Sequence, residues 1–203
     1  MSITIEPTTI RMTKGFEQHF CNSMSSKRGA DSNFGAKLDR QLVNIDGGYR
    51  NHFLGIAFGM AADMVEDYPT GFWYLADLNH GDSFFIYPTE RGTDLYRIVF
   101  RDKDNKPTSC YDLDEKTLGL LVTALSLKKT EDDATRMQME ADNVVKNGGM
   151  PTHHDADAAK NLKAKRVELI NMVVNSTEEI AATTEDDALA NIALRDFILS
   201  HID

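Results

Sequence analysis

The chain has 203 residues, of which 41% are hydrophobic and 27% charged, and this indicates one soluble globular domain or a small domain with an appended helical region. Its 32 acids and 22 bases give a net charge of −10, which argues against direct nucleic-acid binding because phosphate neutralisation needs clustered Lys and Arg. Cys21 and Cys110 are the only cysteines, which excludes a disulfide framework and a cysteine zinc site and favours a reducing compartment.

The N-terminal region carries weak structural signals. It lacks a signal-peptide pattern, and no apolar run in the chain approaches the roughly 20 residues of a membrane span, so we expect a cytoplasmic protein without membrane contact. Residues 1–14 alternate weakly and predict an edge strand or an extended arm. Phe16–Met24 predicts a short helix, and Ser25–Gly48 predicts mainly loop, with one more short helical or extended piece around Leu38, Leu42, Val43 and Ile45.

The strongest folding signal runs from Tyr49 to Arg101. Tyr49–Asp67 predicts one long helix, because apolar side chains recur at helical spacing around most of its circumference. Gly55 and Gly59 lie four residues apart in it, which we interpret as a place where another backbone packs closely. Four short strands are predicted behind this helix, the last of them an edge strand: Phe72–Leu78, Ser83–Pro88, Leu95–Arg101 and Thr108–Leu113.

These elements predict the fold class. Period-2 alternation with one mixed face is typical of a sheet that helices cover on one side. We therefore expect an α+β fold in which a small antiparallel β-meander of three to four strands packs against the long apolar helix, with a mostly helical region behind it.

The C-terminal half is predicted to be helical and acidic. Residues 112–203 hold 18 acids and 10 bases. One helix is expected over Asp114–Lys129 and a second from Thr130 to the Gly148-Gly149 pair, with further helices behind it. We expect two units, an α+β domain over residues 1–129 and an acidic helical extension over residues 130–203 that packs on it.

One cluster combines histidines with carboxylates. Its members are candidate metal ligands: His153, His154, Asp155 and Asp157. Adjacent positions point in different directions, and no further Cys or His recurs nearby at ligand spacing. We therefore favour a solvated helix N-terminus, whose acids suit the helix dipole, and predict no metal site.

No catalytic motif accompanies the remaining polar residues. Carboxylates cluster at the end of the long helix and around the first hairpin, and His80 lies beside Asp82 and near Asp77. No nucleophile elbow, zinc-binding helix or phosphate loop occurs. We predict no enzyme and no cofactor, although a small hydrolase using this Asp/His set stays open as an alternative.

The central stretch resembles the plasmid-borne antirestriction proteins of the ArdB/KlcA type over about Tyr49–Leu127. That family has a hydrophobic helix, a Tyr-x-Gly-Gly-Tyr-Trp element and a turn followed by an aromatic strand that ends in Pro. The matching residues here are Tyr68, Gly71, Phe72, Trp73, Asn79, Gly81, Phe84, Phe85, Tyr87, Pro88 and the stretch Leu118–Val122. Thr70 and the pair Asp82-Ser83 depart from the pattern.

The resemblance implies an α+β domain without established catalytic residues that helps incoming DNA of a mobile element escape type I restriction. The expected partner is a restriction enzyme complex or another host DNA-processing protein. An acidic C-terminal region could mimic DNA charge, but −10 over 203 residues is mild for a mimic. We favour a protein-binding patch on the meander, made of Trp73, Asp77, Asn79, His80 and Asp82.

A different class of function also stays open. Residues 130–203 contain apolar stripes, one of them formed by Ala134, Met137, Ala141, Val144 and Val145. Such stripes are typical of helices that pair. The alternative prediction is therefore a helical accessory protein that forms a homodimer and has no antirestriction activity.

Overall fold

The computed structural model describes residues 5–21, 26–27, 33–42, 47–66, 68, 73–79, 83–88, 95–150, 157–180 and 184–202. The helices in these ranges are α1 (Lys14–Phe20), α2 (Asn33–Gln41), α3 (Gly47–Met64), α4 (Glu115–Lys146), α5 (Ala158–Glu179) and α6 (Glu185–Ile202). The strands are β1 (Thr8–Ile10), β2 (Ser26–Lys27), β3 (Trp73–Asp77), β4 (Phe84–Pro88), β5 (Tyr96–Arg101) and β6 (Pro107–Leu113). This combination confirms the α+β class and the four predicted strands of the central region, but the fourth, β6, lies between β1 and β5 and is not the expected edge strand.

The strands form two sheets, and the single meander is therefore wrong. One sheet has the order β1-β6-β5 and the other β2-β3-β4. The hairpin pairs β3–β4 and β5–β6 are antiparallel as predicted, whereas β1 pairs with β6 in parallel. Strand β4 does not continue to β5 because helix α4 covers its outer edge: Thr123 Oγ1 on α4 accepts a hydrogen bond from Ile86 N at 2.9 Å.

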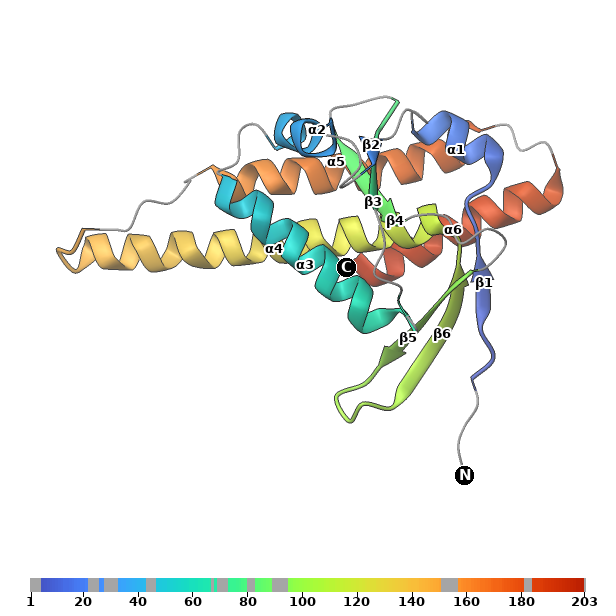
Figure 1. Ribbon diagram of the computed structural model, residues 1–203, viewed down its shortest axis with the longest axis horizontal. Helices are drawn as coiled ribbons and strands as arrows, with labels where there is room; N and C mark the ends of the chain where they lie inside the picture. The colour runs from blue at the N-terminus through green and yellow to red at the C-terminus, as the bar shows by residue number, and fades with distance from the viewer. Residues whose placement is uncertain are drawn as a thin grey trace.

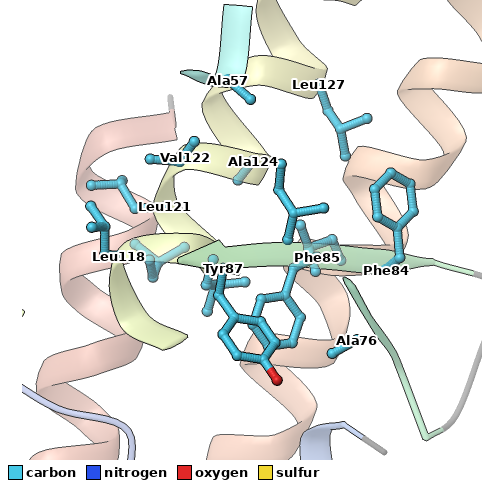
Figure 2. Packing of buried hydrophobic residues seen from close by; sticks show 14 of the residues in the cluster. Ala57, Ala76, Phe84, Phe85, Tyr87, Leu118, Leu121, Val122, Ala124 and Leu127 are labelled. Atoms are coloured by element: carbon cyan, nitrogen blue, oxygen red, sulfur yellow. The ribbon is translucent and has the colours of Figure 1, made fainter. Parts of the chain in front are cut away.

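The core lies where α4 crosses β4. All five residues of β4 are buried, and Figure 2 shows the strand beside α4, with the side chain of Phe84 on one side of the strand and those of Phe85 and Tyr87 on the other. The contact is close because Gly119 of α4 has no side chain. A Cβ at this position would overlap Tyr87 Cβ and lie 2.6 Å from Tyr87 Cα. The helix backbone therefore approaches the strand backbone directly.

The first turn of α4 also holds the N-terminal arm. Asp114 caps the helix, since its Oδ1 accepts from Thr117 N at 2.7 Å, and its Oδ2 accepts from Met12 N at 2.6 Å. Desolvation by burial raises the pKa of Asp114, and the hydrogen bonds from the backbone of Thr117 and Met12 oppose that rise. The Asp114 carboxylate thus caps α4 and holds the chain just after β1. Because β1 lies at the edge of its sheet, the predicted edge strand is confirmed.

Two predictions about the helices are wrong. Helix α4 continues through Thr130, where a new helix was expected; the Thr130 hydroxyl donates to Ser126 O at 2.7 Å inside the helix and does not cap a new one. The predicted unit boundary between residues 129 and 130 therefore falls within one helix. Gly55 and Gly59 lie on the exposed side of α3 with no atom within 4 Å of a Cβ built there, so they mark no close packing.

Helix α4 reaches beyond the body of the protein. Figure 1 shows α3 and α5 beside its first part, while its C-terminal end extends past the other described elements. Across the described ranges, no helix is long and apolar enough to cross a membrane.

Candidate interaction surface

Trp73 does not belong to an exposed patch. Its side chain is 1% exposed, and its Nε1 donates to the Tyr68 hydroxyl at 2.6 Å. The indole also packs against Phe58, with ring centroids 5.5 Å apart. The prediction of Trp73 as a partner-binding residue is wrong, because the α3 side of the sheet buries this face of β3.

The other predicted patch residues are used within the fold or lie outside the described ranges. The half-buried Asp77 Oδ1 accepts from Gln41 Nε2 at 2.8 Å, and Gln41 Oε1 accepts from Lys165 Nζ at 3.3 Å. The exposed Asn79 donates from Nδ2 to the carbonyl oxygens at the end of α1, at 2.7 and 3.0 Å. Asp77 therefore joins β3 to α2 and α5, and Asn79 closes a helix C-terminus. His80 and Asp82 lie outside the described residues.

The described residues contain no group of three or more His, Cys, Asp or Glu side chains that could hold a metal ion. Of the four candidate ligands, His153, His154 and Asp155 fall outside those ranges. Asp157 is exposed at the N-cap position of α5, where its carbonyl oxygen accepts from Asn161 N at 2.9 Å.

A different surface is formed by residues Met137–Met150, which we call the α4 tip. From Asp142 to Met150 every residue is exposed. The helix ends at a defined point, because Gly148 adopts φ +79°, a conformation that favours glycine. Gly148 N and Gly149 N donate to the carbonyl oxygens of Val145 and Val144, both at 2.9 Å. The predicted helix stop at Gly148-Gly149 is confirmed.

The α4 tip exposes an apolar face. Met137, Val144 and Val145 are 45%, 42% and 55% exposed, and residues seven and eight apart lie on the same side of a helix. Ala141 lies between them and is buried. Met139 on the opposite side is 62% exposed. Large apolar side chains that gather on an exposed helix are typical of an interaction site.

Acidic residues flank this apolar face. Glu140 lies on one side of it and Asp142 on the other, and both are exposed. Asp142 Oδ1 accepts from Gln138 Nε2 at 2.9 Å, which holds its carboxylate along the helix. The α4 tip is therefore an apolar strip between negative charges.

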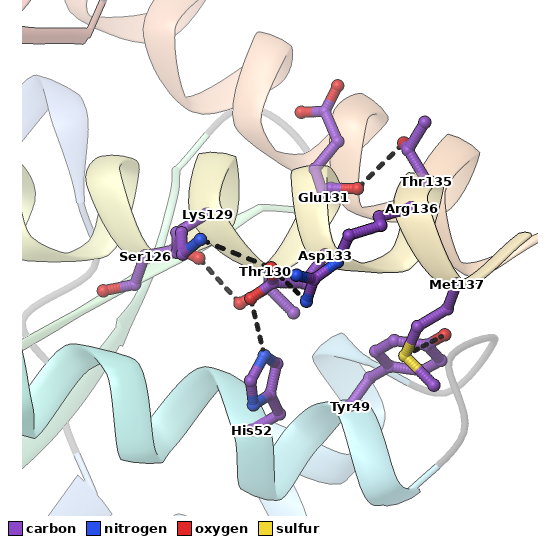
Figure 3. Close-up of polar contacts among 10 residues, drawn as sticks. All are labelled: Tyr49, His52, Ser126, Lys129, Thr130, Glu131, Asp133, Thr135, Arg136 and Met137. Carbon is purple, nitrogen blue, oxygen red and sulfur yellow. Dashed lines mark hydrogen bonds and ion pairs between the residues drawn. The ribbon is translucent and has the colours of Figure 1, made fainter. Parts of the chain in front are cut away.

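A cluster of charged residues fixes α4 to α3 just before the tip (Figure 3). Asp133 Oδ2 lies 2.9 Å from His52 Nε2 of α3, and its Oδ1 accepts from Lys129 Nζ at 3.3 Å and Arg136 Nη2 at 3.1 Å. The hydroxyl of Tyr49, also on α3, points at the Met137 sulfur, 3.7 Å away. These contacts with α3 thus hold α4 in place where the tip begins.

Helix α5 braces the same region from its own side. Arg166 Nε donates to Glu131 Oε2 at 2.8 Å, and the two side chains are 17% and 14% exposed. An ion pair this shielded has well-defined geometry. Glu131 and Asp133 are both paired with basic side chains of this chain, so the exposed negative charge of this region belongs to other residues of α4.

Asp133→Asn is expected to lower the free energy of unfolding by about 1 kcal/mol at neutral pH, because Lys129 and Arg136 lose the carboxylate that they share and the hydrogen bond with His52 weakens. Burial alone raises the pKa of Asp133, but the hydrogen bonds from His52 and Lys129 and the charges of Lys129 and Arg136 lower it overall from 3.8. The stabilisation is therefore present above pH 3.8 and is lost as pH falls through the lowered pKa.

Urea denaturation of both proteins across this pH range measures the effect. The stability difference between wild type and variant should vanish at acidic pH, where the protonated Asp133 resembles Asn. A difference that stays constant down to the most acidic pH would contradict the charged role of Asp133.

No family model matches this chain, and no curated protein matches it significantly. Sequence reasoning found the stripe that ends in Val144 and Val145 but assigned it only to self-association. It missed Met139 and Asp133 as parts of the region, because neither fits a helical stripe.

Proposed function

We propose that this protein counters type I restriction of incoming DNA by binding a protein, without catalysis and in the cytoplasm. Its partner is a restriction enzyme complex or another host DNA-processing protein. The observation that carries the proposal is the apolar face of the α4 tip, with Met137, Val144 and Val145 exposed on a helix that two neighbouring helices brace. The resemblance over residues 49–127 supplies the biological setting.

The residues that carry the resemblance support a role in folding more than in binding. Trp73, Phe84 and Phe85 are all buried, and Asn79 holds the end of α1. A partner that bound this motif would need to open the core. The α4 tip therefore takes the place of the predicted patch in our proposal.

A plating assay tests this proposal. Unmodified phage is plated on a strain with a type I restriction system, with and without expression of the full chain. We expect expression to raise plating efficiency by at least about tenfold, and V144Q/V145Q to abolish the rise. L189Q/I192Q is the matched control, because Leu189 and Ile192 are also exposed apolar residues, on α6, at 59% and 41%. Unchanged restriction with a folded, expressed wild type would contradict the proposal.

Self-association is the second candidate, since the same apolar face could pair two copies without antirestriction activity. Light scattering after size exclusion separates the two, because a dimer that V144Q/V145Q converts to a monomer would favour this candidate. The DNA-mimic alternative has less support. Glu131 and Asp133 bind Arg166 and Lys129 rather than forming an open row of charge.

A further inference from the structure

The α4 tip has the charge pattern of a site for a basic partner. Glu140 and Asp142, which flank the apolar face, are exposed acids, whereas Lys146, the only base within the tip itself, lies on the opposite side of the helix. Arg136, just before the tip, is 68% exposed and is paired with Asp133 at 3.1 Å. The charges that flank the apolar face within the tip are therefore negative.

The shape of the tip limits how a partner can bind. A convex helix whose apolar side chains lie at positions 137, 144 and 145 presents a strip along its axis, and a second amphipathic helix matches such a strip with its own apolar stripe. Methionine is flexible and polarizable, and Met-containing surfaces accommodate varied apolar side chains. The helix is already formed and braced, so binding needs little ordering of this side.

Two kinds of helix could cover the apolar face, one from a second copy of this chain and one from another protein, and charge decides between them. In a symmetric dimer the same patch meets itself, so Glu140 and Asp142 would face like charges from the second copy. A partner helix whose apolar stripe is flanked by Lys and Arg instead pairs with them. We propose that the α4 tip binds a basic amphipathic helix of another protein.

This inference rests on the proposed function of the tip as a protein-binding surface. The apolar face supplies the affinity, while the acidic flanks set the partner's charge and speed its approach. Binding should therefore weaken as salt is added.

Fluorescence anisotropy with labelled peptides of about 18 residues tests the inference, using the full chain. The probe is a Leu–Lys peptide with Leu at helical spacing, and a Leu–Glu peptide with the same Leu positions is its control. We expect the Leu–Lys peptide to bind with a Kd on the order of tens of micromolar at low salt. V144Q/V145Q should weaken it by at least about tenfold and E140Q/D142N by about fivefold, with a smaller salt dependence. L189Q/I192Q should leave it unchanged.

Several results would overturn the inference. These are no binding of the Leu–Lys peptide, equal binding of the Leu–Glu peptide, an equal loss in L189Q/I192Q, or a dimer that V144Q/V145Q dissolves. All substituted residues are exposed, and circular dichroism checks that each variant is folded.

The peptide titration contains no restriction enzyme, so the two proposals fail separately. Peptide binding without relief of restriction counts against the proposed function alone. Relief of restriction that depends on Val144 and Val145, without peptide binding, counts against the basic helical partner alone.

Discussion

Gly119→Ala is expected to lower the free energy of unfolding by about 3 kcal/mol. The added Cβ would overlap Tyr87 Cβ and the Ile86 carbonyl oxygen, and these atoms belong to a fully buried strand. Alanine improves helix propensity by about 1 kcal/mol, which does not offset the overlap. Relief requires α4 to move away from β4 and to give up the Thr123 contact.

Urea denaturation followed by the fluorescence of Trp73, the single buried tryptophan, measures this loss. Gly55→Ala and Gly59→Ala are matched controls, because a Cβ at either position meets no atom within 4 Å. Both controls should gain about 0.5–1 kcal/mol from helix propensity alone. A Gly119 variant as stable as wild type would contradict the close approach of α4 to β4.

Thr123→Val is expected to lower the free energy of unfolding by about 2 kcal/mol, although valine has nearly the same shape as threonine. The Thr123 hydroxyl accepts from Ile86 N at 2.9 Å and donates to Gly119 O at 2.7 Å, and Thr123 is fully buried. Valine leaves the Ile86 N–H without an acceptor on the covered edge of β4, where water cannot replace the hydroxyl.

Thr123→Ser is the control, because it keeps the hydroxyl and removes only a methyl group. Its expected loss in the free energy of unfolding is about 1 kcal/mol. Serine should therefore be the better tolerated substitution. Hydrogen exchange adds a local measurement, since the Ile86 amide should exchange faster in the valine variant and stay protected in the serine variant. Equal stability of the two variants would mean that the hydroxyl does not hold the strand edge.

Part of the candidate surface was predictable from sequence. The stripe through Met137 and Val144 and the stop at Gly148 are local signals, because helical spacing and a glycine in the left-handed region act within a few residues. The exposure of the stripe was not predictable. Ala141 is buried and Val145 is not, although both fit the same stripe. Exposure depends on how far other elements accompany a helix, and Figure 1 shows α3 and α5 beside only the first part of α4.

The same distinction explains the misplaced patch. Period-2 alternation placed Trp73 on a strand but could not say which face a helix covers. Its burial follows from Phe58 and Tyr68, on and just beyond the end of α3, and its hydrogen bond to Tyr68 satisfies the indole. An aromatic strand residue looks alike in sequence whether it faces a helix or a partner.

The sequence by itself determined the elements: the long apolar helix, the four strands of the central region, and the stop at Gly148. These depend on propensity, periodicity and capping over a few residues. Only the tertiary structure decided that the strands divide into two sheets and that α4 continues beyond its neighbours. Those outcomes depend on contacts such as Thr123 with Ile86, 37 residues apart, and a local pattern does not specify which distant backbone will lie against it.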